Sequence, residues 1–282
     1  MRKTPLSAPL PESCLAVQLY TVRDFTRTEA GFADTLAKIA AIGYPAVQLS
    51  AVDAMNSGAV SAETARKMLD DHGLKCVATH RPWDELAERT DEAIAFHLTL
   101  GCPFVAIGAL PGGYGGFGAT GADNYRRFIS DATPVIARLK EAGIRFGYHN
   151  HLFEFAPADL DGNRGTLWDI FAAEGGTDFC LELDLYWAWS AGADPAPLLT
   201  RNAGRVPVIH LKDIEIGADG KPGMGAVGEG NMPWDTILAA CRAAQVEWYC
   251  VEQDVCPRDP FDCLASSFRY LTAQATNQGN NT

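Results

Sequence analysis

The chain has 282 residues, 47% of them hydrophobic, and a formal net charge of -12 from 35 acidic and 23 basic residues. A chain of this length buries enough surface to fold without disulfides or a structural metal, and it suits one α/β barrel of roughly 250 residues. Its acidity argues against nucleic acid and anionic membranes as partners, because a negatively charged protein repels polyanions.

The cysteines and the N-terminus bear on the cellular compartment. Eight cysteines are scattered without a CxxC pair, and we interpret them as buried, reduced thiols. The N-terminus lacks the continuous apolar stretch of a secretory signal, and no later segment approaches the roughly 18 apolar residues of a membrane span. We therefore expect a soluble, cytoplasmic protein.

Short apolar segments alternate with segments of helical periodicity along the whole chain. The expected strands are residues 14–20, 46–50, 75–80, 104–108, 144–149, 179–184, 206–212 and 247–253. Helices between successive strands require parallel strands with right-handed crossovers, and eight such units close most simply into a single (β/α)₈ TIM barrel over residues 1–282. The alternative is an open doubly wound sheet, but LYTVRD follows the first strand instead of a glycine fingerprint.

The connecting segments carry further signals. The clearest helix has Phe32, Leu36 and Ile39 on one stripe and ends at Gly43, and we expect Pro134 to kink or interrupt a later helix. The glycine-rich stretches 111–121 and 223–230 are expected to be loops at the barrel mouth that could close over a substrate. Residues 1–13 and 274–282 are predicted to be flexible. We interpret two helical histidines, His72 and His97, as surface or interface residues.

Acids and a histidine interrupt the otherwise apolar later strands. Asp184 ends FCLELD, His210 lies in VIHLKD, Glu252 lies in YCVEQD, and Glu154 follows the fifth strand in YHNHLFEF. The barrel brings the C-terminal ends of its strands to one site, and buried carboxylates are costly unless they are paired or bind metal. These four residues are therefore predicted to bind one divalent ion, Mn²⁺ or Mg²⁺ by their oxygen-rich chemistry, with Co²⁺ or Zn²⁺ possible.

Other polar residues lie near the same strand ends. His149 and His151 alternate onto one face, so an HxH pair is an alternative to Glu154 as the first ligand. Their other expected roles are proton transfer by His149 and substrate contact by His151. Glu182 shares a face with Asp184 one layer deeper, where we expect a supporting ion pair.

Three more residues are expected to contact substrate. His80 ends the third strand, and Lys212 follows His210 by two residues, so both should face the mouth of the barrel. A lysine there can stabilise a developing oxyanion. Trp187 follows the sixth strand and is a candidate wall for a sugar ring.

These motifs resemble the sugar phosphate isomerase/epimerase superfamily of xylose isomerase-like TIM barrels. The resemblance covers nearly the whole chain and rests on LAVQLYTVRD, GYPAVQLS, YHNHLFEF, LDLYWAW, HLKD, VGEGNMPW and VEQD. It implies the same metal site on Glu154, Asp184, His210 and Glu252, with the two glutamates able to serve as acid and base. Relatives include ketose 3-epimerases, inosose dehydratases and enzymes acting on 3-keto-glycosides.

The resemblance implies a metal-dependent isomerase or epimerase of a keto-sugar that acts through an enediolate. The alternative is a lyase or dehydratase that eliminates from a 3-keto-glycoside or inosose. More distant alternatives are a three-zinc nuclease like endonuclease IV and a non-catalytic sugar-binding barrel. No clustered Arg/Lys pair suggests a phosphate clamp, which favours an unphosphorylated small-molecule sugar, and a homodimer or homotetramer is compatible with such barrels.

Overall fold

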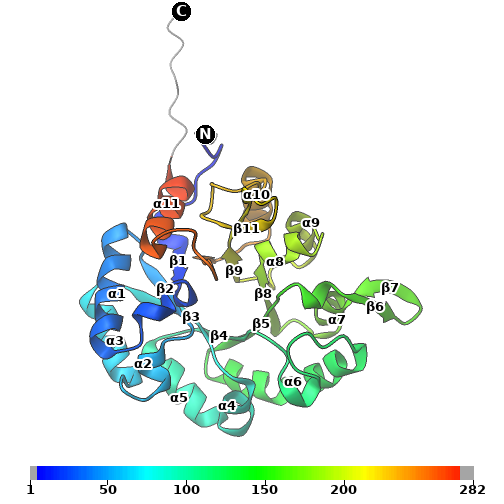
Figure 1. Ribbon diagram of the computed structural model, residues 1–282. Helices are drawn as coiled ribbons and strands as arrows, with labels where there is room; N and C mark the ends of the chain where they lie inside the picture. The colour runs from blue at the N-terminus through cyan, green and yellow to red at the C-terminus, as the bar shows by residue number, and fades with distance from the viewer. Residues whose placement is uncertain (1–4, 274–282) are drawn as a thin grey trace, which may run out of the picture.

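The computed structural model of the protein describes residues 5–273. Within these residues, eight parallel strands form one closed barrel, and helices surround it (Figure 1). The order around the barrel is β1-β12-β9-β8-β5-β4-β3-β2. The strands are β1 Leu15–Gln18, β2 Ala46–Leu49, β3 Lys75–His80, β4 Phe104–Ile107, β5 Arg145–His149, β8 Phe179–Asp184, β9 Val208–Leu211 and β12 Trp248–Val251. The predicted TIM barrel is confirmed, and all eight expected strands are present.

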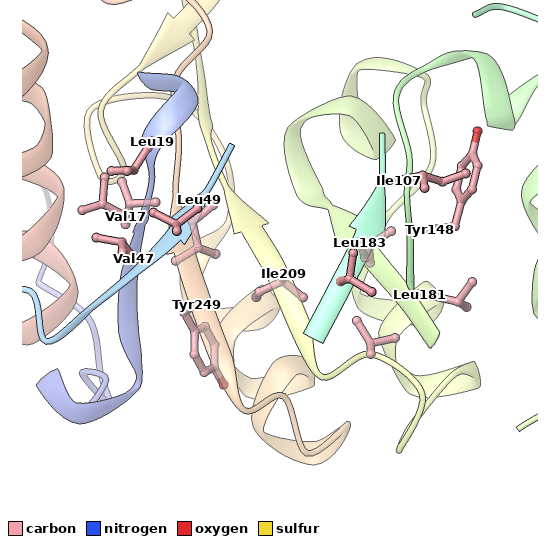
Figure 2. Close-up of a cluster of buried hydrophobic side chains, with 14 of the residues drawn as sticks. Val17, Leu19, Val47, Leu49, Ile107, Tyr148, Leu181, Leu183, Ile209 and Tyr249 are labelled. Carbon is pink, nitrogen blue, oxygen red and sulfur yellow. The ribbon is translucent and has the colours of Figure 1, made fainter. Parts of the chain in front are cut away.

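The two faces of the strands build two hydrophobic layers. Outward-facing residues such as Val17, Val47, Leu181 and Ile209 pack beneath the surrounding helices (Figure 2). A separate buried cluster of mostly small residues fills the bore of the barrel, consisting of Ala16, Ala46, Val77, Ala78, Phe104, Ala106, Cys180, Val208 and Cys250. Because successive side chains alternate between faces, the residue two positions further along a strand also points into the bore.

That two-residue step places polar groups above the apolar part of the bore. In β1, β2, β8, β9 and β12, each apolar bore residue is followed two positions later by a buried polar residue nearer the C-terminal end. These polar residues are Gln18, Gln48, Glu182, His210 and Glu252. The register of the strands therefore gathers them in one layer at the mouth of the barrel.

The aromatic ring of Phe104 explains one glycine in the bore. A Cβ atom at Gly147, on the neighbouring strand, would lie only 2.3 Å from Phe104 Cζ. Only a residue without a side chain fits beside the ring, so Phe104 can lie across the bore beneath the polar layer.

Helices connect the strands as the sequence predicts. Thr28 caps the first helix by accepting from Gly31 N at 3.1 Å, and Gly43 ends it with a φ of 116°. The α-helices are α1 Glu29–Ile42, α2 Asp53–Asn56, α3 Ala62–Asp71, α4 Trp83–Glu88, α5 Thr90–Leu100, α6 Ala122–Glu141, α7 Leu167–Glu174, α8 Leu185–Ser190, α9 Pro195–Arg201, α10 Trp234–Ala243 and α11 Pro260–Thr272. The 3-10 helices are η1 Glu12–Cys14, η2 Leu19–Phe25, η3 Gly112–Tyr114 and η4 Phe153–Phe155.

Of the two expected effects of Pro134, a kink or an interruption, the interruption does not occur. The α-helix α6 runs unbroken from Ala122 to Glu141 with Pro134 inside it. The proline lies on the exposed side of the helix. Water can therefore satisfy the carbonyl that loses its backbone partner, while the apolar face of the helix remains packed.

Two antiparallel hairpins extend from the barrel and were not predicted. The first pairs β6 Pro157–Leu160 with β7 Asn163–Thr166, and the second pairs β10 Asp213–Ile216 with β11 Pro222–Gly225. Figure 1 shows the first hairpin extending beyond the ring of helices.

The segment before β1 is packed where the structure describes it. Leu6 and Leu10 are buried, and Ser7 donates its backbone N–H and hydroxyl to Asp235 Oδ1 at 2.8 and 2.7 Å. Leu6, Ser7 and Leu10 therefore attach this segment to the body of the protein, and its flexibility stays a prediction. Residues 1–4 and 274–282 lie outside the described range. Among the described residues, no helix is long and apolar enough to cross a membrane.

His97 is buried, whereas its helical pattern suggested a surface or interface position. Its Nδ1 lies 2.7 Å from the carbonyl of Ala93 and its Nε2 lies 2.7 Å from Thr79 Oγ1, so Nδ1 donates and Nε2 accepts. Burial outweighs the bond to Ala93 and lowers the pKa of His97 to about 4. The neutral ring therefore joins α5 to β3.

The stability of the protein should fall in acid because of His97. The unfolded residue binds a proton below its ordinary pKa of about 6.5, whereas the folded residue resists protonation down to about pH 4. The stabilisation is present above pH 6.5 and is lost as pH falls towards 4. Urea denaturation at pH 7 and 4.5 should show a loss in the wild type that exceeds the loss in His97→Gln by roughly 2–3 kcal/mol. The exposed His72→Gln variant is the control, and equal losses in all three proteins would contradict this role.

Candidate functional site

A cavity of about 320 Å³ lies at the C-terminal mouth of the barrel. Its size falls within the roughly 300–1,000 Å³ range of small-molecule sites. It is lined by Gln18, Tyr20, Ser50, His80, Gly108, Phe117, His149, His151, Lys212, Glu252 and Asp254. Of the residues predicted to contact substrate or transfer protons, His80, His149, His151, Lys212 and Glu252 line this cavity.

Three side chains beside this cavity form a cluster that can bind a metal ion. Asp184, His210 and Glu252 each direct one ligand atom to a common point, and these atoms lie within 4.8 Å of one another. His210 Nδ1 lies 2.7 Å from Glu252 Oε2 and 3.8 Å from Asp184 Oδ2. All three side chains are buried, and they come from the C-terminal ends of β8, β9 and β12.

Hydrogen bonds around His210 determine which of its nitrogens faces the carboxylates. Gln48 Nε2 donates to Glu182 Oε1 at 2.8 Å, which turns Gln48 Oε1 towards His210 Nε2, also at 2.8 Å. An amide oxygen only accepts, so His210 Nε2 carries a proton and donates it. The lone pair that a metal requires is then on Nδ1, the atom that faces Asp184 and Glu252.

The cluster contains more negative than positive charge. Asp184, Glu182, Glu252 and Asp254 are acidic, and Lys212 is the basic side chain among them, with its Nζ 2.8–2.9 Å from an oxygen of Asp184, Glu252 and Asp254. Three buried atoms, Asp184 Oδ2, His210 Nδ1 and Glu252 Oε2, have no well-aligned hydrogen bond to any described residue, although Lys212 is within ion-pair distance of both oxygens. Ligand atoms that lack well-aligned hydrogen bonds and an excess of negative charge are both compatible with a divalent cation bound at this point.

The pKa shifts have the same electrostatic cause. Burial alone would lower the pKa of His210, but Glu252 and Glu182 raise it to about 10. Burial would raise the pKa of Glu252, but Lys212 and His210 outweigh the effect of burial and hold this pKa well below its usual range. Burial raises the pKa of Asp184 to about 6 against the pull of Lys212. Positive charge is therefore favoured between these side chains.

A second group of ligand-type atoms lies deeper, around Glu182. Glu182 Oε2 accepts a close hydrogen bond from His80 Nε2 and lies 3.6 Å from His149 Nδ1 and 3.5 Å from His210 Nε2. Against the effect of burial, His80 and His210 lower the pKa of Glu182 to about 2. The ionised carboxylate therefore holds three imidazoles around it, as an ion-pair role for Glu182 requires.

Glu154, a predicted ligand, is not among the residues whose ligand atoms converge in the metal cluster. Its Oε1 accepts from the Tyr148 hydroxyl at 2.7 Å, and its Oε2 accepts from His151 N at 2.8 Å. Tyr148 belongs to the hydrophobic layer outside the barrel, because it precedes the inward-facing His149 by one residue. The turn of η4 directs Glu154 to that outer side, where it supports the backbone of His151.

His149 and His151 both lie at the cavity, and their rings are 4.9 Å apart. Burial, reinforced by His210 and His151, lowers the pKa of His149 well below 6.5, and burial together with Lys212 lowers that of His151 to about 4. Both rings are therefore neutral. Trp187 packs beside them, with Lys212 Nζ 5.6 Å from its ring centroid and its backbone N–H donated to Asp184 Oδ1 at 2.9 Å.

The sequence analysis missed three polar residues of the site. Gln18 Nε2 donates to Glu252 Oε1 at 2.9 Å, Gln48 orients His210, and Asp254 accepts from Lys212 at 2.9 Å. A polar residue inside an apolar strand was the signal that located the acids. The same signal is present in LAVQL and AVQLS, where Gln18 and Gln48 stand.

Comparison with known proteins identifies the class. The profile of the xylose isomerase-like TIM barrel family matches residues 36–271, so the chain belongs to this family. A sugar phosphate isomerase/epimerase from Parabacteroides distasonis has a similar structure, with a TM-score of 0.75 and 20% sequence identity over 96% of this chain and 97% of that one. No match was found among curated proteins.

Two further solved structures are similar. An L-ribulose 3-epimerase has a TM-score of 0.66 and 15% identity, and the match covers 91% of this chain and 92% of the epimerase. An IolI protein with a bound zinc atom has a TM-score of 0.65 and 13% identity, with 91% and 94% covered. At these identities the likeness establishes the fold.

The segment after Lys212 is organised by Asp213, which is fully buried at the start of β10. Its carboxylate accepts from the backbone N–H groups of Ile214, Gly228, Gly230 and Met232 at 2.9–3.1 Å and from Trp234 Nε1 at 2.7 Å. A Cβ at Gly230 would lie 2.2 Å from Asp213 Oδ1. The second glycine-rich stretch is thus bound tightly to the residue that follows Lys212.

Replacing Asp213 by Asn should destabilise the protein. The amide presents a donor to several N–H groups that need an acceptor, and leaving buried donors unsatisfied should cost roughly 2–4 kcal/mol. Urea denaturation should show this loss, and limited proteolysis should cut residues 226–234 faster. Asp219→Asn, an exposed change in the β10–β11 turn, should alter stability by less than about 1 kcal/mol. A variant as stable and protease-resistant as the wild type would contradict the role of Asp213.

Proposed function

We propose that the protein is a divalent-metal-dependent isomerase or epimerase of an unphosphorylated keto-sugar. The observation that carries the proposal is the convergence of Asp184 Oδ2, His210 Nδ1 and Glu252 Oε2 beside a sugar-sized cavity. Membership of a family with sugar isomerases and epimerases among its structural relatives supports it. The lysine in the cavity pairs with three carboxylates, which disfavours a sugar phosphate.

The three converging residues are the proposed metal ligands. Two carboxylates and one imidazole form a mostly oxygen donor set, which favours Mn²⁺. Three protein ligands leave coordination positions for substrate, as catalytic metal sites require. A divalent ion held there supplies Lewis acidity to the carbonyl oxygen and neighbouring hydroxyl of a keto-sugar.

The chain's own residues would handle the proton. His149 lines the cavity as a neutral imidazole. Its buried Nδ1 lies 3.6 Å from Glu182 Oε2, so Nε2 is the nitrogen proposed to accept a proton. It is therefore suited to remove a proton from the carbon beside the carbonyl. Lys212 carries an ammonium group into the same cavity, where it can stabilise negative charge that develops on the substrate oxygen.

The fate of that proton decides the product. Its return by His149 to the adjacent carbon gives an aldose–ketose isomer. Delivery of a proton to the original carbon from the opposite side gives an epimer. Glu252, the other proton-transfer candidate lining the cavity, is ionised, so it would have to take a proton from water before this delivery, and His149 would return the abstracted proton to water. Loss of a leaving group from the neighbouring carbon would instead make the enzyme a lyase.

Metal binding depends on the three ligands in this proposal. Asp184→Asn should weaken Mn²⁺ binding by more than about 100-fold, because loss of a ligand exceeds the roughly 10–100-fold effect of losing an outer partner. Calorimetric titration with MnCl₂ measures the affinity, and elemental analysis after dialysis measures the stoichiometry. Asp254→Asn is the matched control, since its carboxylate contacts Lys212 outside the ligand cluster, and its affinity should stay within about tenfold. Wild-type affinity in Asp184→Asn would exclude this metal site.

Turnover separates the role of His149 from that of Glu252. Incubation with a panel of ketoses in deuterated water, followed by NMR, should show deuterium entering the carbon beside the carbonyl with wild-type protein. His149→Gln should reduce this exchange by roughly 100-fold or more while retaining Mn²⁺, because it removes only the proton acceptor. Glu252→Gln should lose both exchange and tight metal binding. Loss of Mn²⁺ from His149→Gln would instead make His149 a ligand, and exchange at the wild-type rate in Glu252→Gln would refute the assignment.

A further inference from the structure

Beside the three proposed metal ligands, a second group of ligand-type atoms surrounds Glu182. One ligand atom from each of His80, His149, Glu182 and His210 lies within 4.8 Å of the others. These residues stand at or near the C-terminal ends of β3, β5, β8 and β9, so the group belongs to the polar layer at the mouth of the barrel. It differs in composition from the metal cluster, because it has three imidazoles and one carboxylate.

His149 Nδ1 is a buried atom that lacks a hydrogen-bond partner among the described residues. It lies 3.6 Å from Glu182 Oε2, which is too long for a hydrogen bond. Two ligand atoms that each lie about 2.0–2.1 Å from one tetrahedral zinc ion are roughly 3.3 Å apart. The separation of these two atoms is therefore close to the separation that a shared ion requires.

His80 Nε2 is a second nitrogen of this group, in close contact with Glu182 Oε2. A metal ion would replace the proton between these two atoms. The ring would then carry its proton on Nδ1, because a neutral imidazole has one donor and one acceptor nitrogen. His210 offers no lone pair here, since its Nε2 donates to Gln48. The available ligand set is therefore His80 Nε2, His149 Nδ1 and Glu182 Oε2.

This ligand set favours a different ion from the first cluster. Two imidazole nitrogens and one carboxylate oxygen suit Zn²⁺, and the affinity of such ligands is lowest for Mn²⁺ among the first-row divalent ions. Three protein ligands leave a coordination position free. That position lies towards the cavity, because His80 and His149 both line it.

We propose that His80, His149 and Glu182 form a second metal site, selective for Zn²⁺ over Mn²⁺, whose occupation inhibits the enzyme. A neutral imidazole has one lone pair, so His149 cannot bind an ion through Nδ1 and accept a proton through Nε2 at the same time. The inhibition rests on the proposed function, which assigns His149 as the proton acceptor, whereas the zinc site does not.

Zinc stoichiometry tests the site on the full-length protein. Titration with ZnCl₂, followed by dialysis and elemental analysis, should give two zinc ions per wild-type chain, because zinc also fits the first cluster. MnCl₂ should give one manganese ion. His80→Gln should retain one zinc ion and bind the second more than about 100-fold more weakly, because a ligand is lost. His149→Gln should behave in the same way, and it keeps the test open if His80→Gln fails to fold.

His151→Gln is the matched control for these variants. Its ring lines the same cavity but belongs to neither group of ligand atoms, so this variant should still bind two zinc ions.

Deuterium exchange into a ketose tests the inhibition. Adding ZnCl₂ to the manganese-loaded protein should slow exchange in the wild type at least about tenfold more than in His80→Gln, since loss of a general base costs roughly 100-fold or more. Displacement of manganese from the first cluster affects both proteins equally, so the difference between them isolates the second site.

The outcomes separate the two proposals. One zinc ion per wild-type chain, or a second zinc ion that persists in both ligand variants, overturns the second site and leaves the proposed function standing. Equal slowing of exchange in the wild type and His80→Gln overturns the inhibition. Absence of exchange in the manganese-loaded wild type overturns the proposed function, whereas the zinc stoichiometry still decides the second site.

Discussion

The site depends on one buried imidazole with different partners on its two nitrogens. His210 Nε2 is held by the Gln48 amide, and Nδ1 faces the carboxylates of Asp184 and Glu252. Gln48 can do this only because Glu182 fixes its amide orientation. The chain of contacts from Glu182 through Gln48 to His210 crosses the bore. It selects one tautomer of His210, in which Nε2 carries the proton and Nδ1 carries the lone pair that can bind a metal.

The alternation of side chains along a strand explains how much of this arrangement the sequence predicts. Short apolar strands separated by helices predict the barrel, and an acid within an apolar strand identifies Asp184 and Glu252 as inward residues at the mouth. Glu154 follows its strand by five residues, beyond the reach of that periodicity. Its direction depends on the turn of η4 and on Tyr148, which a two-residue pattern cannot show.

Local turn chemistry and tertiary burial account for the other differences. The β6–β7 hairpin turns at Asp161 and Gly162, which have φ values of 53° and 88°. An Asp-Gly pair is a hairpin signal, but here it lies between the expected strands 144–149 and 179–184, where the alternation of elements predicts a helix. The sequence of α5 does not show that His97 is buried, because its hydrogen-bond partner Thr79 belongs to the strand β3.

The ring of Phe104 has a consequence for how a ligand reaches the candidate site. It lies against Gly147 in a bore filled by buried apolar side chains, beneath the polar layer. These apolar side chains separate the polar layer from the opposite end of the barrel. Under the proposed function, substrate would enter and product would leave through the same C-terminal mouth, so a bound product would block the next substrate until it leaves.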